Sequence, residues 1–339
     1  MKAAVVESPG KIGFVEMPIP SPQSGEVVVR MRACGVCGTD VEKVYGEGVS
    51  GKILGHEAVG EVFQVGEGID GVRRGERVFT HHHVPCYSCD VCARGAVTFC
   101  PEYRKHNLVP CGLAEYYVLP RFNVERGGLT RLPDGLGFED ASFIEPLACC
   151  VRGLEVVHAR DAKSALICGA GPIGITHLKL LKSYGVKKIA IAEMSDYRRG
   201  FAEQAGVDLS FNPAKQGEKE RVLKEFPGGP ELVVVAAGAT GAFEDAMRVV
   251  GQAGKVLQFG APEKGATAEF DLARFYLKGV ELMTSYAASG EDVEAATKLL
   301  EDGSVDVSDM ITHRFPLEDA AEAFSVAQQQ RCMKAVITN

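Results

Sequence analysis

The chain has 339 residues, more than one typical core accommodates, and its length predicts two domains. Hydrophobic residues make up 46% and charged residues 24%, and no apolar run approaches the roughly 20 residues that span a bilayer, so we expect no membrane insertion. The net charge of −8 is spread along the chain, which argues against nucleic acid as a partner.

The N-terminal segment and the cysteines both indicate a cytoplasmic protein. Residues 1–17 lack the basic segment, the long apolar core and the small-residue cleavage site of a signal peptide. The chain has eleven cysteines, an odd number, and four of them are clustered. In a reducing cytosol, such a cluster is better interpreted as a set of metal ligands than as disulfides.

Two kinds of apolar pattern divide the chain. Residues 1–140 are rich in Gly, Pro and short alternating segments, such as 26–33 and 60–66, which predicts a mainly β unit. From about residue 148 to 285, short apolar runs alternate with stretches of helical period, which predicts a parallel α/β sheet with strands buried on both faces. The runs lie at 164–171, 187–193, 231–238, 254–260 and 280–286. Two helix-like segments at 291–303 and 317–329 and a strand-like segment at 334–339 complete the chain.

A glycine-rich turn follows the first strand of the α/β segment. Gly169, Gly171 and Gly174 form G-x-G-x-x-G with Pro172 and Ile173 between them, and a helix-like stretch follows. The glycines allow a tight turn and a close approach of a pyrophosphate to N–H groups at a helix N-terminus. This pattern predicts a dinucleotide-binding turn, although a glycine turn can also serve packing alone.

The next strand ends at Glu193, where a carboxylate would accept hydrogen bonds from the ribose hydroxyls of NAD and repel the phosphate of NADP. We therefore expect NAD rather than NADP. Arg198 and Arg199 leave NADP as an alternative cofactor, because an arginine near that strand end can bind a 2′-phosphate. Both can equally be solvated residues on a helix face.

The clustered cysteines, Cys86, Cys89, Cys92 and Cys100, have the spacing C-x2-C-x2-C-x7-C. Four thiolates so close in sequence can complete a tetrahedral shell around Zn²⁺ and leave no position for substrate, which predicts a structural site. His81, His82 and His83 precede this cluster and are not needed as ligands. We expect them to be polar residues at a strand end or groups that face the substrate cleft.

A second set of candidate ligands lies upstream. Cys37 is followed eighteen residues later by Gly55, and then by His56 and Glu57. One thiolate, one imidazole and one carboxylate would make a three-ligand catalytic site with room for water or substrate. From the residues alone, a structural role for a lone Cys and a His-Glu pair remains open. Glu145 is a further carboxylate that could face the same metal.

Taken together, these segments resemble the zinc-dependent medium-chain dehydrogenase/reductase superfamily of alcohol dehydrogenase-like enzymes. The matching segments are "CGVCGTD" (34–40), "GHEAVGEV" (55–62), "CYSCDVCARGAVTFC" (86–100), "EPLA" (145–148), "GAGPIG" (169–174) and "THRFPLEDAAEAF" (312–324). They follow the family's order and cover nearly the whole chain. The resemblance implies a mainly β, GroES-like catalytic domain at 1–148 with a structural zinc lobe at 86–100. It also implies a doubly wound Rossmann cofactor domain at 149–286 and a return to the catalytic domain at 287–339.

Within the superfamily, "GHE", "EPLA" and "THRFPL" look closer to polyol (sorbitol-like) and threonine dehydrogenases than to ethanol dehydrogenases. The resemblance implies Cys37, His56 and Glu57 as ligands of a catalytic zinc, with Glu145 as a direct or water-mediated fourth partner. Cys149 and Cys150 fit the start of the linking helix better than a ligand position. Thr39 matches the family's hydroxyl residue and would take the proton from the alcohol. Where the threonine enzymes carry a histidine, this chain has Glu42, which argues against threonine as substrate.

The expected activity is hydride transfer between a secondary alcohol of a polyol, sugar or diol and NAD(P), with two zinc ions per chain. Polar residues that could hold further hydroxyl groups of the substrate are Tyr45, His81, His82 and Glu115, although each can equally be an ordinary surface group. The alternatives are a threonine-type amino-alcohol dehydrogenase and a catalytically silent nucleotide-binding protein. Superfamily members are commonly dimers or tetramers, so we expect a homo-oligomer, and the buried-looking strand at 280–286 is compatible with a sheet that continues across a dimer.

Overall fold

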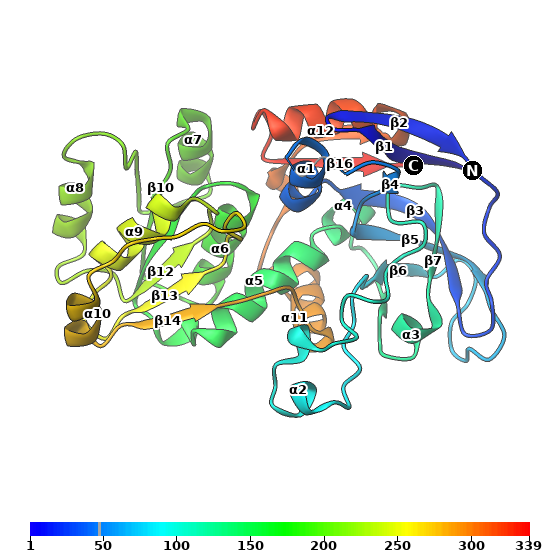
Figure 1. The fold of residues 1–339 in the computed structure, drawn as a ribbon, viewed down its shortest axis with the longest axis horizontal. Coiled ribbons are helices and arrows are strands. Elements are labelled where there is room, and N and C mark those ends of the chain that lie inside the picture. The colour runs from blue at the N-terminus through cyan, green and yellow to red at the C-terminus, as the bar shows by residue number, and fades with distance from the viewer. Residues whose placement is uncertain (47–48) are drawn as a thin grey trace. The chain divides into compact units, whose positions relative to one another are not determined.

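The computed structural model describes residues 1–46 and 49–339, and the chain forms two compact units. Unit 1 comprises residues 1–148 and 288–339, and unit 2 comprises residues 149–287. The chain crosses from unit 1 to unit 2 within one helix, α5 (Ile144–Val156), and returns between Ala287 and Ala288. Figure 1 shows the elements of each unit in chain order.

Unit 1 is built on two sheets. The larger one has the order β15-β16-β3-β5-β6-β8, with β7 on the same edge of β3 as β16, and the smaller one has the order β2-β1-β4. Apart from the parallel pair β15 and β16, the pairings are antiparallel. The central strand β3 is buried along most of its length because β5 pairs with one of its edges and β7 and β16 with the other.

The strands of unit 1 are β1 (Lys2–Ser8), β2 (Lys11–Glu16), β3 (Val27–Gly35), β4 (Lys52–Ile53), β5 (Glu57–Val65), β6 (Arg77–Thr80), β7 (Tyr116–Leu119), β8 (Leu129–Arg131), β15 (Ile311–Pro316) and β16 (Lys334–Thr338). Its helices are α1 (Gly38–Tyr45), α2 (Asp90–Ala93), α3 (Arg121–Val124), α4 (Phe138–Ala141), α11 (Gly290–Glu301) and α12 (Ala320–Gln328), with short 3-10 turns η1 (Val97–Phe99), η3 (Ser308–Met310) and η4 (Leu317–Asp319).

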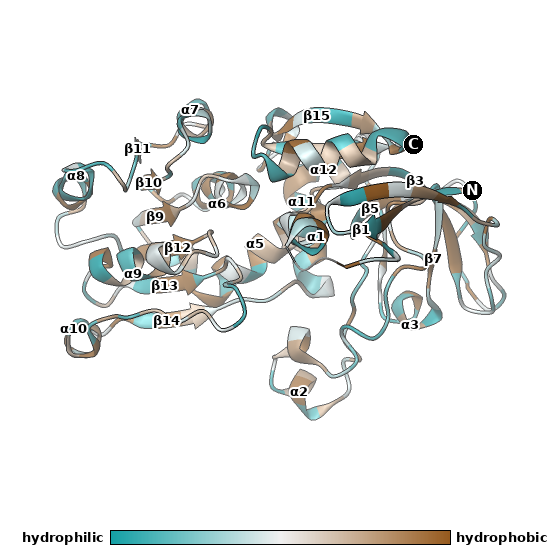
Figure 2. Cartoon of the chain, turned by 45° about the horizontal axis from the view of Figure 1, so that its top comes forward, coloured by the Kyte–Doolittle hydropathy of each residue, from teal (hydrophilic) through white to brown (hydrophobic). Residues whose placement is uncertain are grey.

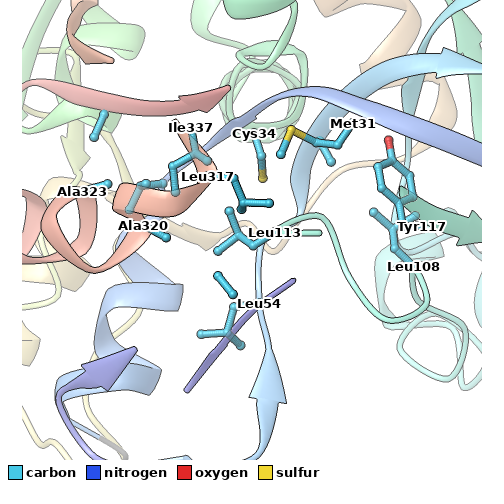
Figure 3. Close-up of a cluster of buried hydrophobic side chains, with 14 of the residues drawn as sticks. Met31, Cys34, Leu54, Leu108, Leu113, Tyr117, Leu317, Ala320, Ala323 and Ile337 are labelled. Atoms are coloured by element: carbon cyan, nitrogen blue, oxygen red, sulfur yellow. The ribbon is translucent and has the colours of Figure 1, made fainter. Parts of the chain in front are cut away.

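The core of unit 1 joins segments that are far apart in sequence. Side chains of β3, β5 and β7 pack with those of the last helix and the last strand, as Figure 3 shows for Cys34, Leu317, Ala320 and Ile337. The C-terminal segment therefore belongs to the same hydrophobic core as the N-terminal strands.

Unit 2 is a six-stranded parallel sheet with the order β11-β10-β9-β12-β13-β14. The strand order reverses between β9 and β12, as in doubly wound sheets, in which right-handed crossovers place helices on both faces. Strands β9, β10 and β12 are almost fully buried, and Figure 2 shows β9 in brown and helices α7 and α8 largely in teal. The predicted doubly wound α/β sheet is confirmed.

The strands of unit 2 are β9 (Ser164–Cys168), β10 (Lys188–Ala192), β11 (Leu209–Phe211), β12 (Leu232–Val235), β13 (Lys255–Gln258) and β14 (Glu281–Thr284). Its helices are α6 (Pro172–Ser183), α7 (Asp196–Gln204), α8 (Glu218–Glu225), α9 (Thr240–Val249) and α10 (Leu272–Lys278), with one 3-10 turn, η2 (Ala159–Asp161).

The structure differs from the sequence prediction at three strands. Strand β11 is only three residues long, and β15 follows an irregular apolar pattern, so neither gave a periodic signal. The run at 280–286 was expected to be buried, but β14 is the last strand of the sheet and most of its residues are exposed. An apolar run by itself cannot distinguish a central strand from an edge strand.

Among the described residues, no helix combines the length and the apolar character needed to cross a membrane.

A buried histidine in α6 makes the stability of unit 2 sensitive to acid. His177 is fully buried, its Nδ1 donates to the Ile173 carbonyl at 2.9 Å, and its Nε2 has no hydrogen-bond partner among the described residues. Burial disfavours the imidazolium and lowers the pKa of His177 to about 4. The unfolded chain therefore binds a proton that the folded chain excludes between about pH 6.5 and pH 4.

We predict that His177→Leu removes part of this acid sensitivity. Wild-type stability that is fully present above pH 6.5 is lost as the pH falls to about 4, and His177 accounts for about 3 kcal/mol of that loss. Urea unfolding at a series of pH values measures the difference between the two proteins. His158→Asn is the matched control, since His158 is exposed in the same unit and its left-handed backbone suits Asn. Equal acid slopes in wild type and His177→Leu would contradict the prediction.

Candidate active site and metal centres

Three potential metal ligands from two elements of unit 1 converge. Cys37 is the N-cap residue of α1, His56 lies just before β5, and Glu57 is the first residue of β5. One ligand atom from each lies within 4.8 Å of the other two. The partial positive charge at the start of α1 favours an anion at Cys37. Sulfur, nitrogen and oxygen donors in one set suit zinc with a position left open.

Pairing of β3 with β5 brings these ligands together. Gly35, the last residue of β3, is the register partner of Glu57, and Cys37 follows two residues after Gly35. Residues that face each other in register lie on the same face of a sheet, so the chain that leaves β3 passes directly beside the start of β5. Cys37 and His56 therefore lie close together although they are far apart in sequence.

Asp40 fixes the orientation of His56. Its Oδ2 accepts hydrogen bonds from His56 Nδ1 at 3.0 Å and from the Gly55 N–H at 3.1 Å, while Oδ1 pairs with Lys43 Nζ at 3.0 Å. Burial raises the pKa of the Asp40 carboxyl, but the charges of His56 and Lys43 outweigh it and hold that pKa low. Because Nδ1 donates to Asp40, Nε2 of His56 is left to bind a metal. Asp40 was not predicted, although it lies in the "CGTD" segment.

A buried lysine pairs with the third candidate ligand. Lys334 Nζ, at the start of β16, makes an ion pair with Glu57 Oε2, and the two residues are 4% and 1% exposed. Val336 is the register partner of Gly35, so Lys334 approaches the Cys37 end of β3 from the opposite edge to Glu57. A side chain at Gly35 would collide with both members of the pair. Gly35 thus provides the space in which Lys334 reaches Glu57.

The other residues predicted for this site, Thr39 and Glu145, do not belong to the set of three converging ligand atoms. Thr39 Oγ1 lies 3.2 Å from Cys37 Sγ and is exposed, so its hydroxyl adjoins the ligand set. Glu145 is 8% exposed in the first turn of α5, and its charge raises the pKa of Lys334. Its carboxylate does not belong to the described set that lies within 4.8 Å. Glu42 is exposed on α1.

The histidine run lies directly beside this set. His82 is buried, and its ring centroid is 4.9 Å from that of His56 and 4.2 Å from that of His83. Asn123 donates to the carbonyls of both His81 and His82, which fixes the backbone after β6. Burial lowers the pKa of His81 to about 3 and that of His83 to about 4, and it holds the pKa of His82 well below its ordinary value. The three imidazoles are therefore neutral at pH 7.

Tyr45 and Glu115 have structural contacts that the sequence did not indicate. The Tyr45 ring packs beside Gly10 and against the core of unit 1, and Glu115 accepts a hydrogen bond from the Lys2 N–H at 2.6 Å. In His81 and His82, the Nδ1 atom is buried and has no hydrogen-bond partner among the described residues. Of the four residues considered for substrate hydroxyls, His82 has the clearest relation to the ligand set.

The second cysteine set forms a separate closed cluster. The sulfur atoms of Cys86, Cys89, Cys92 and Cys100 all lie within 4.8 Å of one another. The Ser88 N–H donates to Cys86 Sγ at 3.5 Å and lowers the pKa of that thiol to about 6, whereas burial raises the pKa of Cys92 to about 12. Four sulfurs at these separations match a tetrahedral Zn²⁺ shell with no open position.

The glycine-rich turn of unit 2 has the geometry of a phosphate-binding loop. Gly169 has a φ of +104°, and a side chain at Gly174 would collide with the Gly169 carbonyl. Gly171 caps α6, and Pro172 occupies the first turn of that helix, followed by Ile173. Backbone N–H groups at the start of α6 therefore remain accessible to a phosphate.

Glu193 follows β10 and is tied to the same turn. Its carboxylate accepts the Ala170 N–H at 2.8 Å and the Ser195 N–H at 2.9 Å, which leaves each oxygen able to accept another hydrogen bond. Arg198 lies over Gly171, and its Nε is buried with no hydrogen-bond partner among the described residues. Arg199 is instead bound to the carbonyls of Glu193 and Met194 and to Asp196.

Two known protein domains match this chain. Residues 23–128 match the alcohol dehydrogenase GroES-like domain, and residues 172–302 match the zinc-binding dehydrogenase domain. Together the two domains cover well over half of the chain. The chain belongs to the zinc-dependent medium-chain dehydrogenase/reductase superfamily.

Individual members of the superfamily are similar over nearly their whole length. The chain is 29% identical to sorbitol dehydrogenase from Bombyx mori over 99% of this chain and 97% of that protein. It is also 29% identical to L-threonine 3-dehydrogenase from Pyrococcus horikoshii, over 95% and 94%. A zinc-binding dehydrogenase from Sinorhizobium meliloti bound to NADP is 25% identical with a TM-score of 0.90, and an alcohol dehydrogenase from Escherichia coli complexed with NADH is 26% identical with a TM-score of 0.89. Each alignment covers 100% of this chain and 99% of the solved one.

Lys334 gives a direct test of the charge balance in this dehydrogenase. In metal-free protein, Lys334→Met leaves the Glu57 carboxylate buried without a cation, and we expect unfolding free energy to fall by about 3–5 kcal/mol. Urea unfolding after chelation measures this loss. Lys2→Met is the control, because its pair with Glu318 is exposed and contributes at most about 1 kcal/mol. Losses of similar size in both variants would contradict the role of the buried pair.

Proposed function

We propose that this chain catalyses hydride transfer between a secondary alcohol of a polyol, sugar or diol and a nicotinamide cofactor. The observation that carries the proposal is the convergence of Cys37, His56 and Glu57, with His56 oriented by Asp40. The donor types fit zinc, and the set uses only three protein ligands, as catalytic zinc sites do. Similarity to polyol dehydrogenases over nearly the whole chain supports the same reaction class.

The residues around the ligand set have distinct proposed roles. Zinc held there supplies a Lewis acid that makes the alcohol proton easier to remove, and the nicotinamide supplies the hydride acceptor. Thr39 relays the proton: its oxygen accepts the alcohol proton while its own hydroxyl proton passes to solvent, because the hydroxyl adjoins Cys37 and is exposed. Lys334 offsets the negative charge of Glu57, and Glu145 serves as a direct or water-mediated fourth partner.

Two further features of the holoenzyme are part of the proposal. We infer a second, structural zinc at Cys86, Cys89, Cys92 and Cys100, since their sulfurs leave no open coordination position. We also infer a preference for NAD, because the Glu193 carboxylate would repel a 2′-phosphate. Arg198 is the residue that would permit some use of NADP. Eleven free cysteines suit a reducing compartment, which supports the cytoplasm.

The two alternative functions are less well supported. The threonine-type reaction is favoured by similarity to threonine dehydrogenases. The family resemblance implies a histidine in those enzymes at the position of Glu42, which argues against it. A silent nucleotide-binding protein would have no need of a complete ligand set, yet all three ligand atoms converge and Asp40 orients the imidazole. The alcohol, polyol or sugar reaction therefore remains the main proposal.

A substrate screen with metal analysis tests the function. We expect two zinc ions per chain and reduction of NAD, more slowly of NADP, with polyols, aldoses or diols but not threonine. Cys37→Ser should lower the zinc content to one per chain and reduce kcat/KM at least about 100-fold, whereas Cys111→Ser keeps both zinc ions. Two zinc ions with no turnover on any substrate would favour the silent alternative, and turnover of threonine alone would favour the amino-alcohol reaction.

We propose that two chains associate through the β14 edge of unit 2. β14 pairs only with β13 among the described strands, and the neighbouring helix α10 has no buried residues. Leu272, Tyr276 and Leu277 of that helix are 68%, 81% and 76% exposed, and Leu282 of β14 is also exposed. An exposed strand edge flanked by large apolar side chains is commonly covered by another chain. A second copy offers the same edge, so a two-fold pairing is self-complementary.

Sedimentation velocity tests this association. The double variant Tyr276→Glu with Leu277→Glu places charges in the apolar patch and should shift the sedimenting species from dimer or larger to monomer at micromolar concentration. Leu223→Glu on α8 is the control, as Leu223 is exposed on another helix of the same unit. Wild-type protein that sediments as a monomer, or a double variant that retains the wild-type size, would refute the proposed interface.

A further inference from the structure

The point at which the chain returns to unit 1 is held in an unusual conformation. Ala287 has a φ of +55°, which side chains other than glycine rarely adopt, and Ala288 and Ser289 are buried directly after it. Ser289 then caps α11 in a reciprocal arrangement with Asp292. A strained residue persists only when the surrounding structure fixes it, so we expect specific contacts to hold residues 287–290 in place.

Tyr103 supplies the first of these contacts. Its phenol is 1% exposed, donates to the Ala288 carbonyl at 2.5 Å and accepts from the Ala288 N–H at 3.3 Å. One side chain therefore satisfies both backbone groups of the first residue of the return segment. The two residues are separated by 185 positions in sequence, so this contact depends entirely on the tertiary fold.

Tyr87 supplies the second contact. Its hydroxyl accepts the Gly290 N–H at 3.2 Å, at the start of α11. A side chain at Gly290 would approach that hydroxyl to 3.0 Å, so glycine allows the close contact. Tyr87 itself has a φ of +57°, which is also left-handed. Each of the two hydrogen-bonded segments thus contains one residue with a left-handed backbone, Tyr87 in the first and Ala287 in the second.

Both tyrosines are attached to the four-cysteine lobe. Tyr87 directly follows Cys86, whose sulfur accepts the Ser88 N–H. The Tyr103 N–H donates to the Cys100 carbonyl at 3.0 Å, and the Cys100 sulfur accepts the N–H of Cys86 at 3.3 Å. The lobe has only α2 and η1 as regular structure, four and three residues long, so its shape depends on what joins the four sulfurs.

We infer that the four-cysteine lobe acts as a metal-dependent clamp on the return segment 287–290. Metal held by Cys86 and Cys100 fixes Tyr87 and Tyr103, and these hold Gly290 and Ala288 at the start of α11. The inference rests on the proposed structural zinc, but not on the identity of the substrate or on catalysis. The four cysteines therefore act on a segment almost two hundred residues away in sequence, in addition to stabilising their own loop.

Hydrogen exchange of the full-length protein, followed by mass spectrometry, tests the clamp without measuring turnover. In Cys89→Ser with Cys92→Ser, which leaves both tyrosines and the Cys37 set in place, exchange of the Ala288 and Gly290 amides should accelerate at least tenfold. Exchange in α6 should stay unchanged. Cys37→Ser is the matched control, since it removes the other metal site and should leave residues 288–290 protected. Protection of 288–290 that survives in the double cysteine variant, while residues 86–103 exchange freely, would overturn the inference.

A second pair of variants keeps the test decisive if the double cysteine variant fails to fold. Tyr87→Phe with Tyr103→Phe retains all ligands and should keep two zinc ions per chain, yet limited proteolysis between residues 286 and 291 should become at least fivefold faster. Tyr184→Phe, whose hydroxyl bonds Glu155 in unit 2, is the control. An unchanged cleavage rate in the tyrosine pair would overturn the clamp. A zinc content of one in wild type would instead overturn the proposed second zinc.

Discussion

The register between β3 and β5 is the constraint on which the candidate active site depends. Because Gly35 is opposite Glu57, the chain that leaves β3 brings Cys37 beside His56 and Glu57 without any further element. A shift of one residue would turn every side chain of β5 to the other face and move Glu57 away from Cys37. The register is held by eight residues of β3 that pair with β5 and by a core that includes the last strand of the chain.

Charge balance at this site comes from residues of three elements, α1, β5 and β16. Cys37 and Glu57 bring negative charge, and Asp40 adds a buried carboxylate behind His56. Lys43 and Lys334 place cations against Asp40 and Glu57 respectively. Buried carboxylates without such partners would be strongly destabilising, so the lysines stabilise the anionic candidate ligands in place. The site is thus organised by side chains that do not themselves provide ligand atoms.

The two cysteine-containing sites differ in what their sequence spacing determines. Cys86, Cys89, Cys92 and Cys100 are local, so spacing alone predicted that four sulfurs could meet. Cys37 and His56 are separated by a loop, and their spacing left a structural role open until resemblance to a family was considered. Asp40, Lys43 and Lys334 were not predicted, because a single charged residue on a helix or strand carries no signal for a partner elsewhere. Tyr45 and Glu115, which the sequence offered as substrate-binding candidates, make structural contacts.

The sequence by itself determined the parallel α/β sheet, the glycine-rich turn with Glu193, and the four-cysteine lobe, because each depends on periodicity or short spacing. Only the tertiary structure decided that β14 is an exposed edge, that His82 lies against His56, and that Lys334 reaches Glu57 across Gly35. It also decided that Tyr87 and Tyr103 hold the start of α11. These contacts join residues tens to hundreds of positions apart, and strand pairing rather than local propensity sets which of them meet.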